Sequence, residues 1–217
     1  MRNLKTTIIR TILFLMVTSS FSQQEINLAD TFKNKQLKVV NRTLSVFGDQ
    51  GAAVEMNAEK SDGLGILKDV SFDKGVIEIE LLGENNPGKS FIGIAFNIQD
   101  DKTYEAVYFR PFNFVAQEQI RKEHMVQYIY HPEFTWKKLR TDRTGEFENE
   151  IATPPNPDAW FKVRIHIDED RVVVYVSELT EPVLIVDRLT STTSNKIGIW
   201  TGFGSSGRFR NLVLTKE

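Results

Sequence analysis

Apolar and polar residues alternate with a period of two along much of the chain, which is the pattern of half-buried β-strands. The clearest example runs from residue 91 to residue 113, where two alternating runs flank a polar turn at 99–102. Pro111 ends the second run, because proline has no N–H for the ladder of a sheet. The two runs therefore predict a β-hairpin whose core face is formed by Ile92, Ile94, Phe96, Ile98, Val107 and Phe109.

Further short runs of this kind lie on both sides of the hairpin. Before it they occupy residues 37–40, 44–47, 53–58, 64–72 and 76–82, with a turn expected at 48–51. After it they occupy residues 125–131, 161–167, 172–176, 183–186, 197–200 and 209–214. Many short strands without a long helix predict an all-β fold, an antiparallel β-sandwich or barrel. The predicted core adds Val163, Ile165, Val174, Ile197 and Ile199 to the hairpin residues.

Two segments interrupt this pattern. Residues 114–124 are polar and less regular, and they could hold a short helix. Residues 140–157 are expected to be the longest irregular stretch, because they end in three closely spaced prolines that keep the chain extended and out of a central strand.

The first 22 residues have the features of a secretory signal peptide in the right order. A basic start precedes a short apolar run at 12–17, and Ser20-Phe21-Ser22 forms a small-x-small cleavage site. The apolar run is too short to cross a bilayer; the other interpretation of this run is a buried first strand. We predict that residues 1–22 are removed, and that the mature chain 23–217 is one domain, secreted or periplasmic.

Composition narrows the possible functions. The chain has 217 residues, 41% of them hydrophobic, a formal net charge of −2 and no cysteine. The lack of cysteine excludes disulfides, thiol catalysis, thiolate metal sites and a lipoprotein anchor, so an exported fold must be stabilised by its core alone. The near-zero charge gives no electrostatic reason to expect a nucleic-acid partner. No second long apolar run follows the first, so no membrane span is expected in the mature chain.

The second face of the central hairpin carries the candidate chemistry. Tyr108 and Arg110 lie on it, beside the small residues Gly93 and Ala95 of the facing strand. Aromatic rings, one fixed cation and little bulk beside them predict a shallow polar groove. Trp200 alternates with core residues next to a glycine, so its ring could stack on a sugar or pack at an edge under a loop.

Short motifs add a family resemblance. They are FDKGVIEI at 72–79, GIAF at 93–96, YEAVYFRPFN at 104–113, VQYI at 126–129, WFKVR at 160–164, VYV at 174–176, IGIW at 197–200 and GRFRNL at 207–212. Together they resemble the concanavalin A-like lectin/glucanase superfamily, in particular bacterial exported members related to laminin G-like and 3-keto-disaccharide hydrolase-like domains. The resemblance implies a jelly roll with sugar ligands on its concave sheet. It implies no single activity, because this fold hosts lectins, hydrolases and structural modules.

Six residues are predicted to bind the ligand: Tyr108, Arg110, Asn113, Gln127, Trp136 and Trp200. Arg110 could hold a carboxylate or vicinal hydroxyls, or it could form a structural ion pair with Glu105 or another carboxylate. Trp136 and Tyr108 carry the same two alternatives as Trp200, stacking on a sugar or packing under a loop.

No catalytic residue is assigned. Glu78 and Glu80 share one face of a strand, but the E-x-D-x-x-E pattern of family 16 glycosidases is incomplete there, so solvated strand residues are the preferred interpretation. Glu146 and Glu148 are alternative acids in the long loop. Residues 168–170, three acidic side chains in a row, could contact calcium, but a hairpin turn explains them without a metal. No metal or other cofactor is therefore expected.

Three functions remain open. The first is a glycan-binding module whose partner is an oligo- or polysaccharide. The second is a glycoside hydrolase or 3-keto-disaccharide hydrolase-like enzyme that would use Arg110 with a carboxylate on the same sheet. The third is a structural domain without a sugar ligand. The sequence determines neither the glycan nor the oligomeric state.

Overall fold

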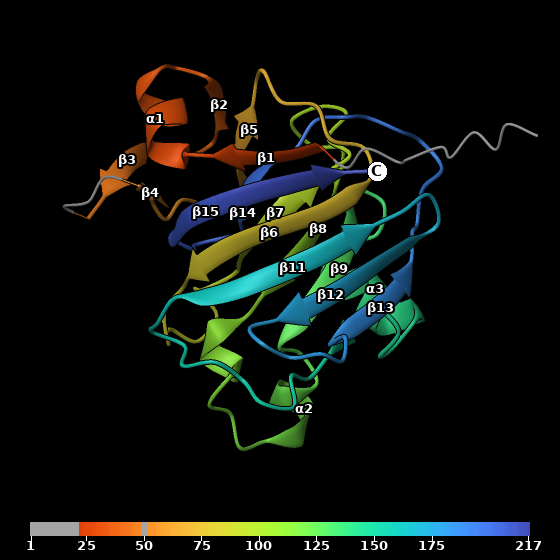
Figure 1. Cartoon of the computed structure of the whole chain (residues 1–217). Helices are drawn as coiled ribbons and strands as arrows, with labels where there is room; N and C mark the ends of the chain where they lie inside the picture. Colours follow the sequence, from red (N-terminus) through yellow and green to blue (C-terminus); the bar gives the residue numbers. More distant parts are fainter. Residues whose placement is uncertain (1–21, 49–51) are drawn as a thin grey trace, which may run out of the picture.

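Two antiparallel β-sheets pack face to face in the computed structural model, which describes residues 22–48 and 52–217 (Figure 1). The predicted all-β antiparallel sandwich is confirmed. The predicted signal peptide, apart from Ser22, and residues 49–51 of the predicted turn lie outside the described residues. Among the described residues, no helix is long and apolar enough to cross a membrane.

The two sheets have simple strand orders. Sheet A runs in the order β13 (Leu184–Asp187), β12 (Arg171–Val176), β11 (Phe161–Ile167), β6 (Gly75–Leu82), β15 (Gly207–Lys216), β4 (Ala53–Met56), β3 (Leu44–Phe47), and β1 (Ser22–Ile26) pairs with the C-terminal half of β15. Sheet B runs in the order β10 (Glu148–Asn149), β9 (Val126–His131), β8 (Tyr104–Phe109), β7 (Ile92–Phe96), β14 (Gly198–Thr201), β5 (Gly63–Leu67), β2 (Leu37–Val40).

The interior between the sheets holds the apolar faces that the alternation predicts. Every predicted core residue is buried in one hydrophobic cluster: Ile92, Ile94, Phe96, Ile98, Val107, Phe109, Val163, Ile165, Val174, Ile197 and Ile199. The two sheets contact each other directly, since the rings of Phe109 on β8 and Phe161 on β11 have centroids 5.5 Å apart. Burial of such side chains stabilises the fold by about 1.5–3 kcal/mol each.

Short helices lie outside the sheets, namely α1 (Leu28–Lys33), α2 (Gln119–Lys122) and α3 (Trp136–Asp142), with a 3-10 turn η1 at Pro111–Asn113. The helix expected within 114–124 is confirmed as α2. The prediction of an irregular stretch from residue 140 to 157 is wrong in part, because α3 extends into it and β10 pairs with β9. Thr135 caps α3 by accepting a hydrogen bond from the Lys138 N–H at 3.3 Å, and Leu139 buries one side of the helix.

Two strands are shorter than the sequence predicts. The run at 64–72 leaves the sheet after Leu67, and the run at 53–58 ends at Met56. The backbone N–H of Phe72 donates to the Asn195 carbonyl at 2.7 Å instead of joining a ladder. In both cases the apolar run continues beyond the last residue that pairs with a neighbouring strand.

Glu78 and Glu80 lie on the outer face of sheet A. Their carboxylates lie 2.6 Å from Lys162 Nζ and 2.7 Å from Arg210 Nη2, respectively. Both pairs are partly exposed, as expected for solvated strand residues. The two glutamates are therefore on a different sheet from the pocket described below.

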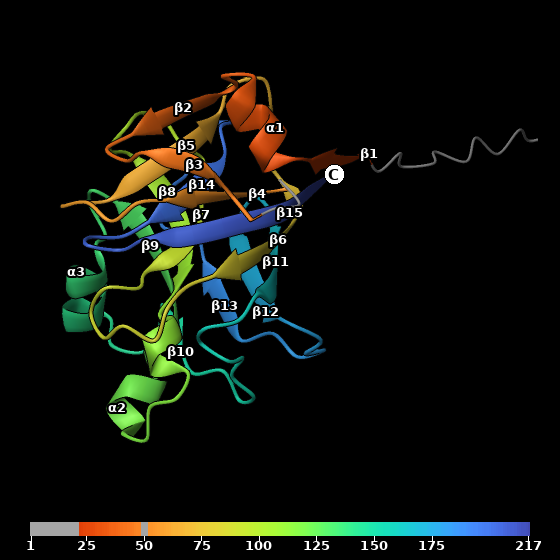
Figure 2. The same cartoon turned by 90° about the vertical axis from the view of Figure 1, so that its left-hand side faces the viewer.

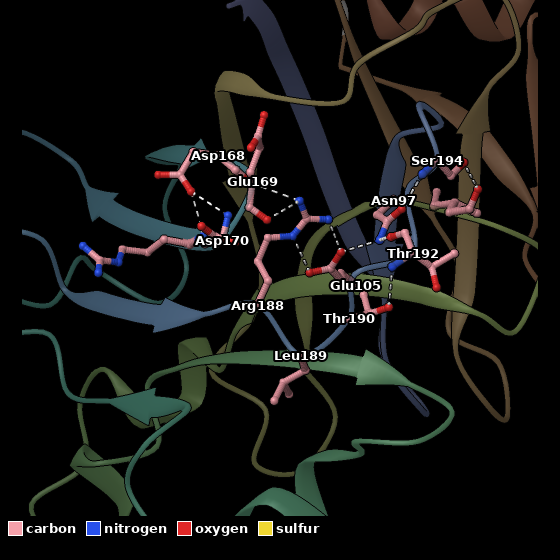
Figure 3. A network of polar contacts seen from close by, with 12 residues as sticks. Asn97, Glu105, Asp168, Glu169, Asp170, Arg188, Leu189, Thr190, Thr192 and Ser194 are labelled. Atoms are coloured by element: carbon pink, nitrogen blue, oxygen red, sulfur yellow. Dashed lines mark hydrogen bonds and ion pairs between the residues drawn. The ribbon is translucent and has the colours of Figure 1, made fainter.

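A buried ion pair lies inside the sandwich (Figure 3). Glu105 on β8 is fully buried and accepts hydrogen bonds from Arg188 Nε (3.1 Å), Arg188 Nη2 (2.5 Å), Asn97 Nδ2 (2.5 Å) and the Tyr128 hydroxyl. Arg188 Nη1 donates to the Asp168 carbonyl at 3.1 Å, and Asn97 Oδ1 accepts from the Ser194 N–H at 2.6 Å. This network ties the segment after β13 to the centre of sheet B.

Candidate functional site

A pocket of about 380 Å³ opens on the face of sheet B that points away from sheet A. Its floor comes from β8, β9 and β14. Its walls come from α3, from η1 and from the loops that precede β5 and follow β14. Figure 2 shows α3 beside β9, on the side away from β11 and β12, where it forms one wall.

One row of paired residues crosses sheet B under this pocket. The strand register places Glu148, Gln127, Tyr108, Gly93 and Trp200 opposite one another on five successive strands. Residues opposite each other in adjacent strands share a face of the sheet. At Gly93, a Cβ would lie 2.8 Å from Tyr108 Cβ and 2.1 Å from the Val107 carbonyl oxygen. The missing side chain lets the rings of Tyr108 and Trp200 meet, with centroids 4.9 Å apart.

Trp200 is part of the pocket floor and is only 3% exposed. Its Nε1–H donates to the Tyr104 hydroxyl at 3.1 Å, and that hydroxyl donates to Asp62 Oδ2 at 3.0 Å. The His131 ring stacks on Tyr104, and its Nδ1 lies 3.5 Å from Asp62 Oδ2. Burial lowers the pKa of His131, an effect that Asp62 partly offsets, so the ring is neutral at pH 7.

Arg110 lies at the other end of the floor with its side chain 6% exposed. Its Nη2 donates to the Tyr108 hydroxyl at 2.7 Å and also to Gln127 Oε1, while Nη1 donates to the His124 carbonyl at 3.0 Å. Its Cζ lies 4.9 Å from the centre of the Tyr108 ring. Burial lowers the pKa of Arg110 from its usual value, although arginine stays charged in any such setting.

Glu148 supplies a buried negative charge beneath this end of the pocket. Arg140 of α3 binds it with two hydrogen bonds, of 2.9 Å and 2.6 Å, and Arg110 Nη1 lies 3.7 Å away. His124 Nδ1 is 2.8 Å from Glu148 Oε2, but the ring is not aligned to donate a hydrogen bond to it. Burial, with help from the two arginines, lowers the pKa of His124 despite the carboxylate, so this ring is also neutral at pH 7.

Two exposed aromatic rings stand on the rim of the pocket. Trp136 of α3 is 47% exposed, and Phe203 in the loop after β14 is 61% exposed. The Arg140 guanidinium lies over the Trp136 ring, 5.2 Å from its centre. Both side chains are exposed at the edge of the pocket, where a ligand could reach them.

The structure brings the six predicted binding residues together. Tyr108, Arg110, Asn113, Trp136 and Trp200 line the pocket. Gln127 lies under it, where its Oε1 accepts from the Tyr108 hydroxyl at 2.9 Å, so it supports the floor without lining the cavity. Of the three predicted stacking rings, only Trp136 is exposed, and Tyr108 and Trp200 form a buried floor.

The alternative that Arg110 forms a structural ion pair is confirmed for another carboxylate, Glu148, and is wrong for Glu105. Glu105 lies on the opposite face of β8 and pairs with Arg188, whereas the carboxylate beside Arg110 is Glu148. The pairing of β10 with β9 sets Glu148 opposite Gln127 and so places its carboxylate beneath the pocket. The sequence named Glu148 only as an alternative acid in the long loop and did not place it at the pocket, because β10 has only two residues and shows no alternation.

Several lining residues carry no local signal of function in the sequence. They are Asp62, Arg121, His124, His131 and Arg140. Phe203 had one usable signal, since it is a large aromatic residue in a loop of glycine and serine. The pocket receives Asp62 and His124 from loops, Arg121 and Arg140 from short helices, and His131 from the last residue of β9, and the positions of these elements depend on the tertiary fold.

Metal ligands are not clustered in the described part of the chain, where no group of three or more His, Cys, Asp or Glu could hold an ion. Asp168 Oδ1 accepts hydrogen bonds from the N–H groups of Asp170 and Arg171, at 2.9 Å and 2.7 Å. This arrangement is an Asx-type turn joining β11 to β12. The hairpin interpretation of residues 168–170 therefore accounts for their acidic side chains.

Fold and pocket together define a lectin-like β-sandwich with a ligand-sized cavity on one sheet. No family model matches the chain, and neither does any curated protein. Many solved structures are similar in fold. The carbohydrate binding module CBM66 from Bacillus subtilis has a TM-score of 0.57 and 14% identity, over 82% of this chain and 95% of that one.

Two further similar structures contain a bound ligand. The VIP36 exoplasmic/lumenal domain, with Ca²⁺ and Man3GlcNAc bound, has a TM-score of 0.52 and 11% identity, over 84% of this chain and 86% of that one. The Crh5 transglycosylase in complex with NAG has a TM-score of 0.54 and 13% identity, over 90% of this chain and 84% of that one. At such low identity the similarity establishes the fold alone.

Proposed function

We propose that this protein binds an oligo- or polysaccharide in the pocket of sheet B. The observation that carries the proposal is the pair of exposed rings, Trp136 and Phe203, on the rim of one cavity that also has polar groups. A sugar presents an apolar face of C–H groups and an equator of hydroxyls. Aromatic rings suit the first, and the guanidinium, amide and imidazole groups of the pocket suit the second.

Binding is a better account of this pocket than glycoside hydrolysis. Glycosidases of the usual type need two carboxyl groups at the scissile bond. Among the described residues that line the pocket, Asp62 is the one carboxylate. Glu148 lies beneath the lining with its side chain 3% exposed and both oxygens held by Arg140. The resemblance to laminin G-like or 3-keto-disaccharide hydrolase-like domains remains a hypothesis. Release of reducing sugar from a disaccharide panel tests its hydrolase part.

A glycan array with the purified mature chain tests the proposal directly. We expect binding to at least one saccharide, and no release of reducing sugar from that saccharide or from a disaccharide panel. Release of reducing sugar would show that the protein is an enzyme and contradict the proposed binding function. An array without any hit would favour a structural domain without a sugar ligand.

The two rim rings are expected to contribute most of the stacking. Trp136→Ala and Phe203→Ala should each weaken binding of an array hit about 10-fold, which is about 1.4 kcal/mol. Isothermal titration calorimetry measures the loss, and the melting temperature should change little because both rings are exposed. Lys137→Ala is the matched control, since Lys137 is the exposed neighbour of Trp136 on α3 and does not line the pocket. Wild-type affinity in both ring variants would place the site elsewhere.

Export is part of the proposal, because polysaccharides are met outside the cytoplasm. The basic start, short apolar run and small-x-small site predict cleavage after Ser22. Intact-mass measurement on protein purified from the exporting cell should give a chain that starts near Gln23. A mass that includes Met1 on exported material would contradict the signal-peptide prediction.

A further inference from the structure

We infer that the saccharide bound in this pocket is acidic, carrying a carboxylate or a sulfate that the arginines at one end of the pocket recognise. This inference depends on the proposed function, and it specifies the class of glycan. The first observation is the charge of the lining. Three arginines, Arg110, Arg121 and Arg140, line the pocket against the single carboxylate of Asp62.

The cations are gathered at one end of the cavity. Arg110 and Asn113 both donate to the His124 carbonyl, each at 3.0 Å. Arg121 Nε donates to Asn113 Oδ1 at 3.2 Å. Asp62 belongs to a separate group with Tyr104 and His131. The pocket is therefore polarised, with arginines on one side and a carboxylate on the other.

Positive charge exceeds negative charge at the arginine end, where Arg110 and Glu148 are buried and Arg140 is 31% exposed. Arg110 and Arg140 share one carboxylate, that of Glu148, and Arg140 takes both of its oxygens in hydrogen bonds. Arg110 is left at 3.7 Å from Glu148 with its other contacts to neutral groups. One carboxylate offsets the charge of only one of the two arginines, and an anionic ligand would offset the other. Burial, and to a smaller extent the charge of Arg140, lowers the pKa of Arg110.

Arg121 adds a cation that remains accessible. Its Nη2 donates to the Phe112 carbonyl at 2.9 Å, and its Nη1 lies 3.5 Å from Glu118. Glu118 is 63% exposed, so that ion pair is weak and is screened by solvent. Arginine presents a planar fork of donors that fits a carboxylate or a sulfate bidentately. Hydroxyl groups of a neutral sugar do not require three such cations.

Matched acidic and neutral probes test the inference. The acidic probes are an oligogalacturonate and a sulfated galactan oligosaccharide, and the neutral ones are the carboxyl-reduced and desulfated forms of the same chains. We expect at least one acidic probe to bind in calorimetry at least 10-fold more tightly than its neutral counterpart. Its affinity should also fall as salt is raised, because counter-ions screen the arginines. Binding of the oligogalacturonate would identify the acidic group as a carboxylate, and binding of the sulfated galactan would identify it as a sulfate.

Variants locate the binding. Arg121→Gln should weaken the acidic probe about 10-fold, whereas Lys122→Gln, which makes the same charge change beside it on α2 but outside the lining, should not. Trp136→Ala should also weaken the acidic probe, because the sugar ring and its anionic group occupy one pocket. Acidic binding that survives both Arg121→Gln and Trp136→Ala would overturn the inference by placing the site elsewhere on the surface.

The remaining outcomes separate this inference from the proposed function. Equal binding of acidic and neutral probes, or array hits restricted to neutral glycans, with loss in Trp136→Ala, would overturn the acidic ligand and keep the glycan pocket. No binding of any probe together with an array without hits would overturn both.

Discussion

Replacing Arg188 with Met is expected to lower the free energy of unfolding by about 3–5 kcal/mol. The change removes two of the four hydrogen bonds to the fully buried Glu105 and leaves its charge without a cation (Figure 3). It also releases the Asp168 carbonyl, which Arg188 Nη1 binds at 3.1 Å. Denaturant unfolding followed by tryptophan fluorescence measures the loss.

Two companion variants make this test specific. Arg171→Met removes an exposed cation that lies 3.7 Å from Asp187, and it should stay within about 0.5 kcal/mol of the wild type. The double variant Glu105→Gln/Arg188→Met should be more stable than Arg188→Met alone, because a neutral amide leaves no unpaired buried charge. A loss below about 1 kcal/mol in Arg188→Met would show that the pair does not hold the interior together.

Replacing Phe96 with Ala is expected to cost a similar amount, about 3–5 kcal/mol, for a different reason. Phe96 lies on β7, is 2% exposed, and belongs to the hydrophobic cluster between the sheets. Its removal takes away the transfer free energy of a phenyl ring and leaves a cavity that the closed sheets can fill only in part. Thermal and denaturant unfolding both report this change.

Phe203→Ala is the matched control for that variant. The same atoms are removed from a ring that is 61% exposed, so stability should change by less than about 0.5 kcal/mol. Phe96→Ala should therefore change stability, whereas Phe203→Ala should change ligand binding. A cost below about 1 kcal/mol at Phe96 would contradict the alternation that assigns it to the core.

Much of the candidate pocket follows from strand parity. Tyr108 and Arg110 alternate with Val107 and Phe109, so once the latter are core residues the former must lie on the outer face. The same reasoning places Trp200 opposite Ile199. What parity does not give is exposure. The Tyr108 ring packs against Phe91, Arg110 and Trp200, and for this reason it forms with Trp200 a buried floor and not an open stacking surface.

Local sequence patterns do not predict which charged residues pair with one another. Arg110 has Glu105 five residues before it in the chain, yet its carboxylate neighbour is Glu148 on β10, while Glu105 pairs with Arg188, 83 residues away. Sequence distance favours the first pairing. Glu105 and Arg110 lie on opposite faces of sheet B and cannot pair, because side chains an odd number of residues apart along a strand point in opposite directions.

The sequence by itself determined the class of fold, the core residues and the faces of the strands with clear alternation. It could do so because the direction of a side chain along a strand depends on its own backbone alone, and this direction repeats every two residues. The tertiary structure decided which strands are neighbours and in what register. That choice brings Glu148, Gln127, Tyr108 and Trp200 into one row, and it sets Arg121, Arg140 and Phe203 around them. Strand order depends on the packing of the whole chain, and so does the pocket that it creates.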